Sequence, residues 1–193
     1  MDEIKTRKSL NLPDDRKIIL FIGGLIRIKG IDTLLRSIAN MSEKNHSNLV
    51  IIGKGELEYQ LKTLAKELRI ESRVNFMGSR KHDKIPLWLN ACDVFCLPSR
   101  NEGFPAVIAE AFACGRPVVA TRVGGIPEAV TNDTLGILVE PNNTEDEDFA
   151  ATLNKALEKE WDYQALAEYG KRFSWNTIAE EYSELYKNVA SKK

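Results

Sequence analysis

The chain has 193 residues, 43% of them hydrophobic, and its 27 Lys and Arg against 28 Asp and Glu give a formal net charge of −1. This balance excludes a disordered chain and a dedicated nucleic-acid binder, and the length predicts one globular domain or a tight pair of small ones. The start of the sequence has neither a signal peptide nor an apolar run near the ~18 residues of a membrane span, so a cytoplasmic protein is expected.

Three cysteines, Cys92, Cys96 and Cys114, lie in or beside apolar runs. An odd number of cysteines in a chain without a secretory signal is typical of free thiols rather than of disulfides or a zinc site. We therefore expect buried free thiols.

Short apolar runs alternate with stretches of helical period along most of the chain. Continuous runs rich in Ile and Val are typical of strands that are buried on both faces. The alternation requires parallel strands joined by right-handed crossovers, so the predicted fold class is α/β, a doubly wound parallel sheet sandwiched by helices. The expected strands are 17–23, 48–53, 74–77, 94–97, 117–121 and 136–139, and the expected helices are 31–41, 57–68, 84–91 and 105–114.

The two ends of the chain do not follow this alternation. Residues 1–16 form a polar, charged lead-in, and no strand is predicted after Pro141. The acidic segment 144–147 matches a capping box, which favours a helix N-terminus over a metal site. An amphipathic helix at 176–189 must pack its apolar stripe on another surface, which need not be this chain's own sheet.

Ligands of open parallel sheets bind outside the carboxyl ends of the strands, and glycine occurs in most of the loops at that predicted edge. The loop 23–30 follows the first strand with glycines and two cations, and Gly53-Lys54-Gly55 follows the second strand. Flexible backbone N–H groups and cations just before a helix favour an anionic ligand, although neither loop matches a complete nucleotide-binding fingerprint.

The strongest signal is the segment 97–115, whose helix between Pro105 and Gly115 is apolar except for Glu110. A buried carboxylate needs a partner, because its burial costs several kcal/mol otherwise. Glu102 stands just before the helix, so two carboxylates flank a helix N-terminus that attracts anions. This pattern predicts a ligand that is polyhydroxylated at two points and phosphorylated between them. The alternative is a structural partner for Glu110, either an Arg or a backbone N–H.

With these residues the chain resembles the retaining glycosyltransferases of the glycosyl transferase group 1 type (family 4). Glu102 and Glu110 reproduce the E-x7-E motif of that family, in the form Pro-Ser-x-x-Glu-Gly-Phe-Pro followed by Glu-Ala-x-Ala-x-Gly-x-Pro-Val-Val-Ala-Thr. Further motifs that carry the resemblance are Lys29-Gly30-Ile31-Asp32, Gly53-x-Gly55, Val74-x-Phe76-x-Gly78 and Val123-Gly124-Gly125-Ile126-Pro127-Glu128.

The resemblance implies a GT-B architecture, two Rossmann-like domains facing a cleft, of which this chain would be the C-terminal, donor-binding one. The implied division is a lead-in at 1–16, a donor-binding domain at 17–172, and a segment at 173–193 whose helix crosses back to an N-terminal acceptor domain. That acceptor domain would be missing here, so the chain is expected to bind donor but to transfer little or no sugar alone.

The implied reaction moves a hexose-type sugar from a nucleoside-diphosphate sugar to a glycan, lipid or small molecule, without a metal ion or other cofactor. Peripheral membrane association of a longer enzyme is compatible with it. The implied catalytic residues are Lys29, beside the diphosphate, and Glu102, against the sugar, while Glu110 would hold the ribose hydroxyls and 77–80 would border the base. The implied donor-binding residues are Gly23, Gly24, Arg27, Gly53, Gly78, Gly103, Phe104, Ala106 and Glu110.

One position departs from the family pattern, since Gly24 stands where such enzymes usually carry an Arg that contacts the diphosphate. Its absence would weaken donor binding unless Arg27 of the same loop replaces it. Two other functions stay open: a sugar-nucleotide epimerase or phosphorylase of the same plan, and a non-catalytic nucleotide-sugar-binding module. His46 and His82 are expected to be solvated surface residues.

Overall fold

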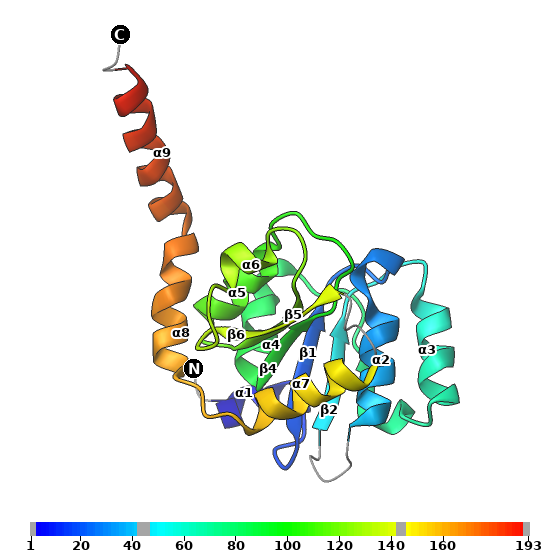
Figure 1. Ribbon diagram of the computed structural model, residues 1–193. Helices are drawn as coiled ribbons and strands as arrows, with labels where there is room; N and C mark the ends of the chain where they lie inside the picture. The colour runs from blue at the N-terminus through cyan, green and yellow to red at the C-terminus, as the bar shows by residue number, and fades with distance from the viewer. Residues whose placement is uncertain (1–2, 42–46, 142–145, 191–193) are drawn as a thin grey trace.

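The computed structural model of the chain describes residues 3–41, 47–141 and 146–190. Their strands form a six-stranded sheet in the order β3-β2-β1-β4-β5-β6, and each pairing is parallel. This arrangement, visible in Figure 1, confirms the predicted doubly wound α/β fold. The strands are β1 (Lys17–Ile22), β2 (Ser47–Ile52), β3 (Val74–Phe76), β4 (Val94–Leu97), β5 (Val118–Thr121) and β6 (Gly136–Val139).

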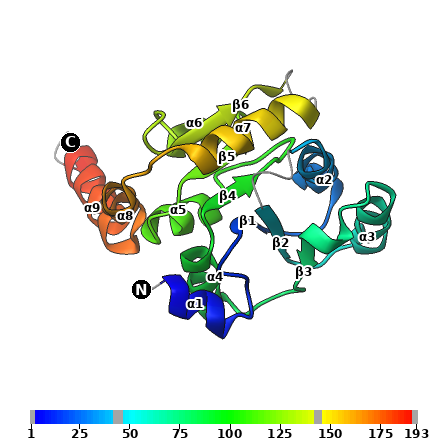
Figure 2. The ribbon, with the colours of Figure 1, turned by 90° about the horizontal axis from the view of Figure 1, so that it is seen from below.

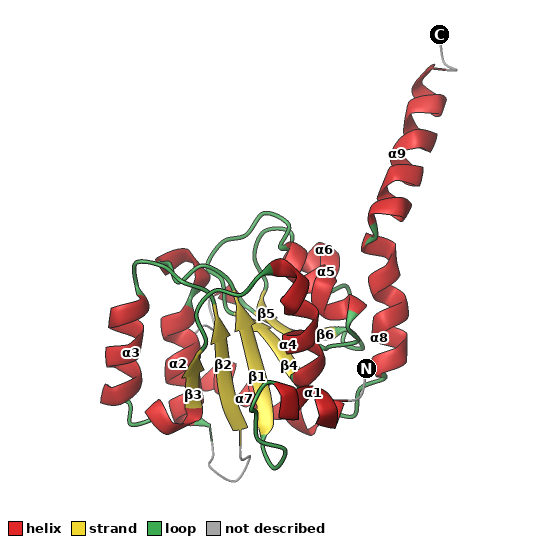
Figure 3. Ribbon diagram, turned by 180° about the vertical axis from the view of Figure 1, so that it is seen from behind, coloured by secondary structure: helices red, strands yellow, loops and turns green. Residues whose placement is uncertain are grey.

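Helices cover both faces of the sheet, as Figures 2 and 3 show. One face carries α2, α3 and α7, and the other carries α4 and α5, with α1 packed on α4 and α8 packed on α5. The helices are α1 (Glu3–Ser9), α2 (Ile31–Asn40), α3 (Glu58–Glu67), α4 (Ile85–Ala91), α5 (Ala106–Ala113), α6 (Ile126–Ala129), α7 (Asp146–Glu158), α8 (Tyr163–Gly170) and α9 (Trp175–Ala190). The short 3-10 turns are η1 (Arg27–Lys29), η3 (Glu71–Arg73), η4 (His82–Lys84) and η6 (Lys171–Phe173).

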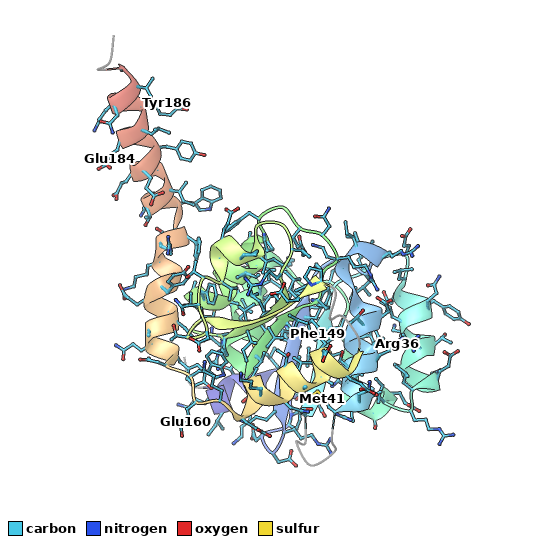
Figure 4. All side chains as sticks on the ribbon, in the orientation of Figure 1. Arg36, Met41, Phe149, Glu160, Glu184 and Tyr186 are labelled. Atoms are coloured by element: carbon cyan, nitrogen blue, oxygen red, sulfur yellow. The ribbon has the colours of Figure 1, made fainter. Side chains whose placement is uncertain are left out.

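The core lies between these layers because the central strands are apolar on both faces. Ile19, Leu20 and Phe21 of β1 are 0% exposed, and so is Phe149, which α7 contributes from one side. In Figure 4 the labelled side chain of Arg36 marks the exposed side of α2. Burial on both faces explains why the strand sequences are continuous apolar runs rather than alternating ones.

The three cysteines are free thiols, as predicted. Cys92 and Cys96 are buried and Cys114 is half-buried. Burial raises the pKa of the Cys96 thiol and of the Cys114 thiol, so both stay protonated at neutral pH.

The predicted helix boundaries hold to within a residue or two. Pro86 lies in the first turn of α4, and Gly115 follows α5 with a φ of +69°. A Cβ at Gly115 would lie 2.5 Å from the carbonyl oxygen of Tyr163, so the helix end requires glycine. Pro105 is the residue before α5 rather than the first of its helical residues. The predicted capping box begins at Thr144, which lies outside the described residues.

The sequence pattern predicts no element before β1, yet residues 3–9 form α1 against α4. The anchor of this helix is Arg7, which is 6% exposed. Its guanidinium donates to the Asp93 carboxylate at 2.7 Å and to the carbonyl of Ala91 at 2.9 Å. Ile4 is 59% exposed, so α1 has no apolar face turned inward, and a search for hydrophobic periodicity could not detect it.

At the other end, α9 extends away from the body of the domain (Figures 1 and 3). None of its described residues is buried, and Trp175, Tyr182 and Tyr186 are 85%, 57% and 70% exposed. Figure 4 shows Glu184 and Tyr186 on its protruding part. The predicted helix is confirmed, and its packing on another domain stays a prediction.

Candidate functional site

The loops after β1 and β4 leave neighbouring strands at the carboxyl edge of the sheet. The chain builds the sheet from β1 outward to β3 and then returns to place β4 on the other side of β1. Open α/β sheets bind their ligands in the crevice at such a switch point. The two loops, 23–30 and 98–105, contain most of the predicted site residues.

Lys29 and Glu102 meet across this crevice. Lys29 Nζ lies 2.6 Å from Glu102 Oε1, and Ser99 Oγ donates to the same oxygen at 2.7 Å. The Glu102 side chain is 9% exposed and the Lys29 side chain is 24% exposed. Within the described residues no donor reaches Glu102 Oε2, which leaves it able to accept a hydrogen bond from a ligand. The sequence therefore brings both predicted catalytic residues to one point.

Arg100 holds the two loops together beside this pair. Its guanidinium donates to both carboxylate oxygens of Asp32, at 2.9 and 2.8 Å, and to the carbonyl of Arg27 at 2.7 Å. Its backbone N–H donates to the carbonyl of Ile28 at 2.8 Å. Partial burial raises the pKa of Asp32, but hydrogen bonds and charge from Arg100 outweigh this, and the pKa ends below its ordinary value. Arg100 thus fixes the register between the loops that carry Lys29 and Glu102.

The loop after β5 supports the backbone at Glu102. At Gly124, where φ is +52°, a Cβ would lie 1.7 Å from the carbonyl oxygen of Glu102. The N–H of Gly125 donates to the carbonyl of Gly103 at 2.8 Å. Only glycine permits this approach together with a positive φ. The segment 123–128, for which the sequence predicts no separate role, therefore positions the Glu102 loop.

A cavity of about 200 Å³ opens beside the loops after β1, β2 and β3, and the predicted residues Gly23, Gly24 and Gly53 line it. A Cβ at Gly53 would lie 1.8 Å from the carbonyl oxygen of Gly23, so glycine lets these loops approach each other. Lys54, Ser79 and Arg80 also line it, together with three isoleucines. The two cations and the glycine backbone suit an anionic group of a ligand, and the isoleucines suit an apolar part of it.

A larger groove, of about 780 Å³, lies between α5 and the junction of α8 with α9. Phe104, Ala106 and Glu110 line it on one side, with Trp175 on the other. The Glu110 side chain is 33% exposed. The expectation that its apolar helix would bury Glu110 is wrong, because α5 packs on the sheet and on α8 while the Glu110 side of the helix faces the groove.

The partner of Glu110 is His82. Its Nε2 lies 3.0 Å from Glu110 Oε1, and the imidazole is 86% exposed. The prediction of an exposed His82 is confirmed, but this contact was not foreseen. An Arg or backbone N–H partner for Glu110, the structural alternative, is not found among the described residues.

The remaining predicted residues, Gly78, Gly103 and Arg27, are not among the residues that line these two cavities. Gly78 has a φ of +67°, and its carbonyl accepts from the N–H of Gly53 at 3.1 Å. At Gly103 an added Cβ would meet nothing within 4 Å. Arg27 is exposed on η1 and lines neither cavity. The cations that line a cavity together with Gly24 are Lys54 and Arg80.

Three residues that contribute to this geometry were not predicted: Ser99, Arg100 and His82. Each is a polar residue that forms a hydrogen bond with a residue across a turn or far away in the sequence. The residues beside it in the sequence do not indicate which partner it contacts. The available signal for Ser99 and Arg100 was their place between β4 and Glu102, inside the motif that carries the family resemblance.

Across residues 3–41, 47–141 and 146–190, none of the helices combines the length and apolar character that crossing a bilayer demands. The same residues contain no group of three or more His, Cys, Asp or Glu side chains that could hold a metal ion.

Named proteins are similar to this chain in sequence or in fold. The chain is 35% identical over 198 residues to D-inositol 3-phosphate glycosyltransferase of Corynebacterium jeikeium, covering 96% of this chain and 46% of that protein. Sucrose-phosphate synthase from Thermosynechococcus elongatus superposes with a TM-score of 0.82 at 29% identity, over 98% of this chain and 49% of that one. HepE of Anabaena in complex with UDP-glucose gives a TM-score of 0.79 at 28% identity, over 96% of this chain and 52% of that one.

The chain spans about half the length of the curated relatives it matches. The family described as glycosyl transferases group 1 matches residues 2–173, a range that includes each of the site residues named above except those at the start of α9. The chain therefore belongs to the glycosyl transferases group 1 family.

Proposed function

We propose that this chain is the donor-binding domain of a retaining glycosyltransferase. The whole enzyme would transfer a hexose from a nucleoside-diphosphate sugar to a glycan, lipid or small-molecule acceptor. The observation that carries the proposal is the Lys29–Glu102 contact of 2.6 Å at the switch point of the sheet, next to the N-terminus of α5.

The chemistry follows from what these groups attract. As the bond to the sugar breaks, negative charge grows on the leaving phosphate oxygen. Fixed donors stabilise such charge without having to reorganise. The ammonium of Lys29, which contacts Glu102, and the N-terminus of α5, which follows Glu102 in the chain, would supply a positive charge and oriented N–H groups to the diphosphate. In this proposal Lys29 provides the charge, and no metal ion is required.

The two carboxylates would take the hydroxyl groups on either side of the diphosphate. Glu102 keeps Oε2 available toward the transferred sugar, and Glu110, the fifth residue of α5, lines the groove, where it would hold the ribose. The groove and the smaller cavity are separated by the segment 79–82, which contributes Arg80 to one and His82 to the other. The base would lie along this segment.

A uridine donor is the first candidate, because HepE, a neighbour at 28% identity, was solved with UDP-glucose. The acceptor would bind mainly to parts of the enzyme that correspond to the other half of the relatives. The exposed aromatic face of α9 is suited to contact such a region, since a large apolar surface in water is a typical interaction surface.

The test is isothermal titration of the chain with UDP, GDP and ADP and with their glucose or mannose derivatives, in the presence of a chelator. We expect at least one to bind, and Lys29→Ala and Glu110→Ala each to weaken that binding by about tenfold or more. Lys171→Ala on the far wall of the groove, beyond the proposed nucleotide contacts, serves as the surface-charge control. No binding of any of these compounds at millimolar concentration would overturn the proposal.

Retention and transfer need the longer enzyme. A chain that includes the preceding domain should convert the α-linked donor found by titration into an α-linked product. A β-linked product would contradict retention, and release of free sugar phosphate on addition of inorganic phosphate would favour a phosphorylase instead.

A further inference from the structure

The contact between His82 and Glu110 joins η4 to α5 at the groove. His82 begins η4 in the connection between β3 and α4, and Glu110 lies on α5. The 3.0 Å distance between His82 Nε2 and Glu110 Oε1 is that of a hydrogen bond.

Hydrogen bonds hold the backbone of His82 in place. The His82 carbonyl accepts the N–H of Ile85, and the N–H of Lys84 donates to the carbonyl of Lys81 at 2.9 Å, so η4 continues directly into α4. α4 is held in turn by Trp88 and Leu89, which are 4% and 0% exposed. The imidazole is thus an exposed group on a rigid base.

Glu110 has little else to hold it in place. It is the one polar residue in the sequence of α5, and the groove wall around it is formed by Ala106, Ala109 and Ala113. Small side chains do not restrict the rotamers of a long one, and fixing a free Glu side chain costs up to about 2 kcal/mol of conformational entropy. His82 is the described residue that donates to its carboxylate, and it does so at Oε1.

We infer that His82 is a positioning residue for nucleoside binding, an inference that rests on the proposed function. It holds the Glu110 carboxylate in one orientation, with Oε2 and the second lone pair of Oε1 directed to the ribose hydroxyls. A carboxylate accepts up to about four hydrogen bonds, so the imidazole and two hydroxyl groups can be bound together. His82 then raises nucleotide affinity by ordering Glu110 before the ligand arrives.

A double-mutant cycle tests this, using whichever of UDP, GDP and ADP the wild-type chain binds most tightly. An exposed hydrogen bond of this kind is worth up to about 1 kcal/mol, so His82→Ala should weaken binding by about three- to fivefold. His82→Gln, which keeps an N–H donor at a similar distance, should restore most of it. In the Glu110→Ala background, which removes the acceptor of the His82 hydrogen bond, His82→Ala should have no further effect.

Two further measurements separate positioning from a structural role. The 2′,3′-dideoxy form of the same nucleotide lacks the hydroxyl groups, so its weaker binding should not change with His82→Ala. Asp83→Asn, in the same turn but directed to Lys84 at 3.6 Å, is the matched control and should leave the affinity unchanged.

Wild-type affinity for His82→Ala, tighter binding, or an equal loss in the Glu110→Ala background or with the dideoxy nucleotide would each overturn the inference. A wild-type chain that binds none of the three nucleotides overturns the proposed function instead. The two failures are therefore distinguishable.

Discussion

The strand β4 has a buried carboxylate near each end, and the two carboxylates are satisfied differently. Asp93 precedes the strand and Glu102 follows it, with side chains that are 10% and 9% exposed. Asp93 uses both of its oxygens: Arg7 and a backbone N–H donate to Oδ2, and Lys17 donates to Oδ1. Glu102 receives its two hydrogen bonds on a single oxygen.

Equal burial therefore accompanies two different roles. A carboxylate whose oxygens are both occupied by its own chain stabilises the fold, here by joining α1 to the amino edge of the sheet, and has no capacity left for a ligand. A carboxylate with one oxygen available in a low-dielectric crevice binds the next suitable donor strongly. The occupation of both carboxylate oxygens, rather than burial, distinguishes the structural end of β4 from its proposed functional end.

The largest expected effect comes from Asp93→Ala, which would remove the carboxylate that pairs with the buried Arg7 guanidinium at 2.7 Å. Removing one partner of a buried ion pair costs about 3–5 kcal/mol, so urea denaturation should give an unfolding free energy that is lower by this amount. Nucleotide affinity of the folded protein should not change. Glu102→Ala, at the other end of the strand, is the comparison and should cost clearly less, because Lys29 remains partly exposed. Equal losses would contradict the distinction between the two ends.

Gly124→Ala should damage the functional end through its backbone. The added Cβ would meet the Glu102 carbonyl oxygen at 1.7 Å with φ at +52°, so the loops must separate. Strain of this kind costs about 2 kcal/mol in unfolding free energy and should also weaken binding of the nucleotide sugar. Gly103→Ala, where a Cβ has open space, is the control for the unfolding measurement. A variant as stable as the wild type would show that the support is unimportant.

Glu102→Gln tests the available oxygen directly. If Glu102 accepts hydroxyl groups of the transferred sugar, the variant should bind the nucleoside-diphosphate sugar about tenfold more weakly, while affinity for the sugar-free nucleoside diphosphate is not reduced. Titration with both ligands measures the difference. A parallel loss for the two ligands would place Glu102 at the diphosphate instead.

The smallest effect concerns Asp32 and acid stability. Its pKa is lowered from 3.8, because the Arg100 contact outweighs partial burial. A carboxyl group whose pKa is lowered in the folded state adds stability above its unfolded pKa of 3.8. This stability is lost as the pH falls through the pKa of the folded state. As the pH is lowered from about 5 to about 3, the melting temperature of Asp32→Asn should therefore fall slightly less than that of the wild type. Identical acid-induced losses would show that the Arg100 contact adds nothing; the effect stays small because the side chain is half exposed.

Local sequence was sufficient for the sheet and for the positions of the loops. Runs such as residues 17–22 are apolar along their whole length, which only a strand covered on both faces needs, and the helical period between them requires parallel connections. Pro86 marks the start of α4 and Gly115 marks the end of α5, because the backbone preference of each residue acts at its own position. These features are local, so one sequence suffices to predict them.

The sequence by itself also predicted which residues form the site, namely Lys29, Glu102 and Glu110 in their motifs. Only the tertiary structure decided what each of them contacts. Buried polar anchors such as Arg7, and partners such as His82, are chosen by distance in space, and a polar side chain carries no periodic signal of its partner. Hydrophobic patterning specifies layers because burial is non-directional, whereas hydrogen bonds are directional and are settled when the loops meet.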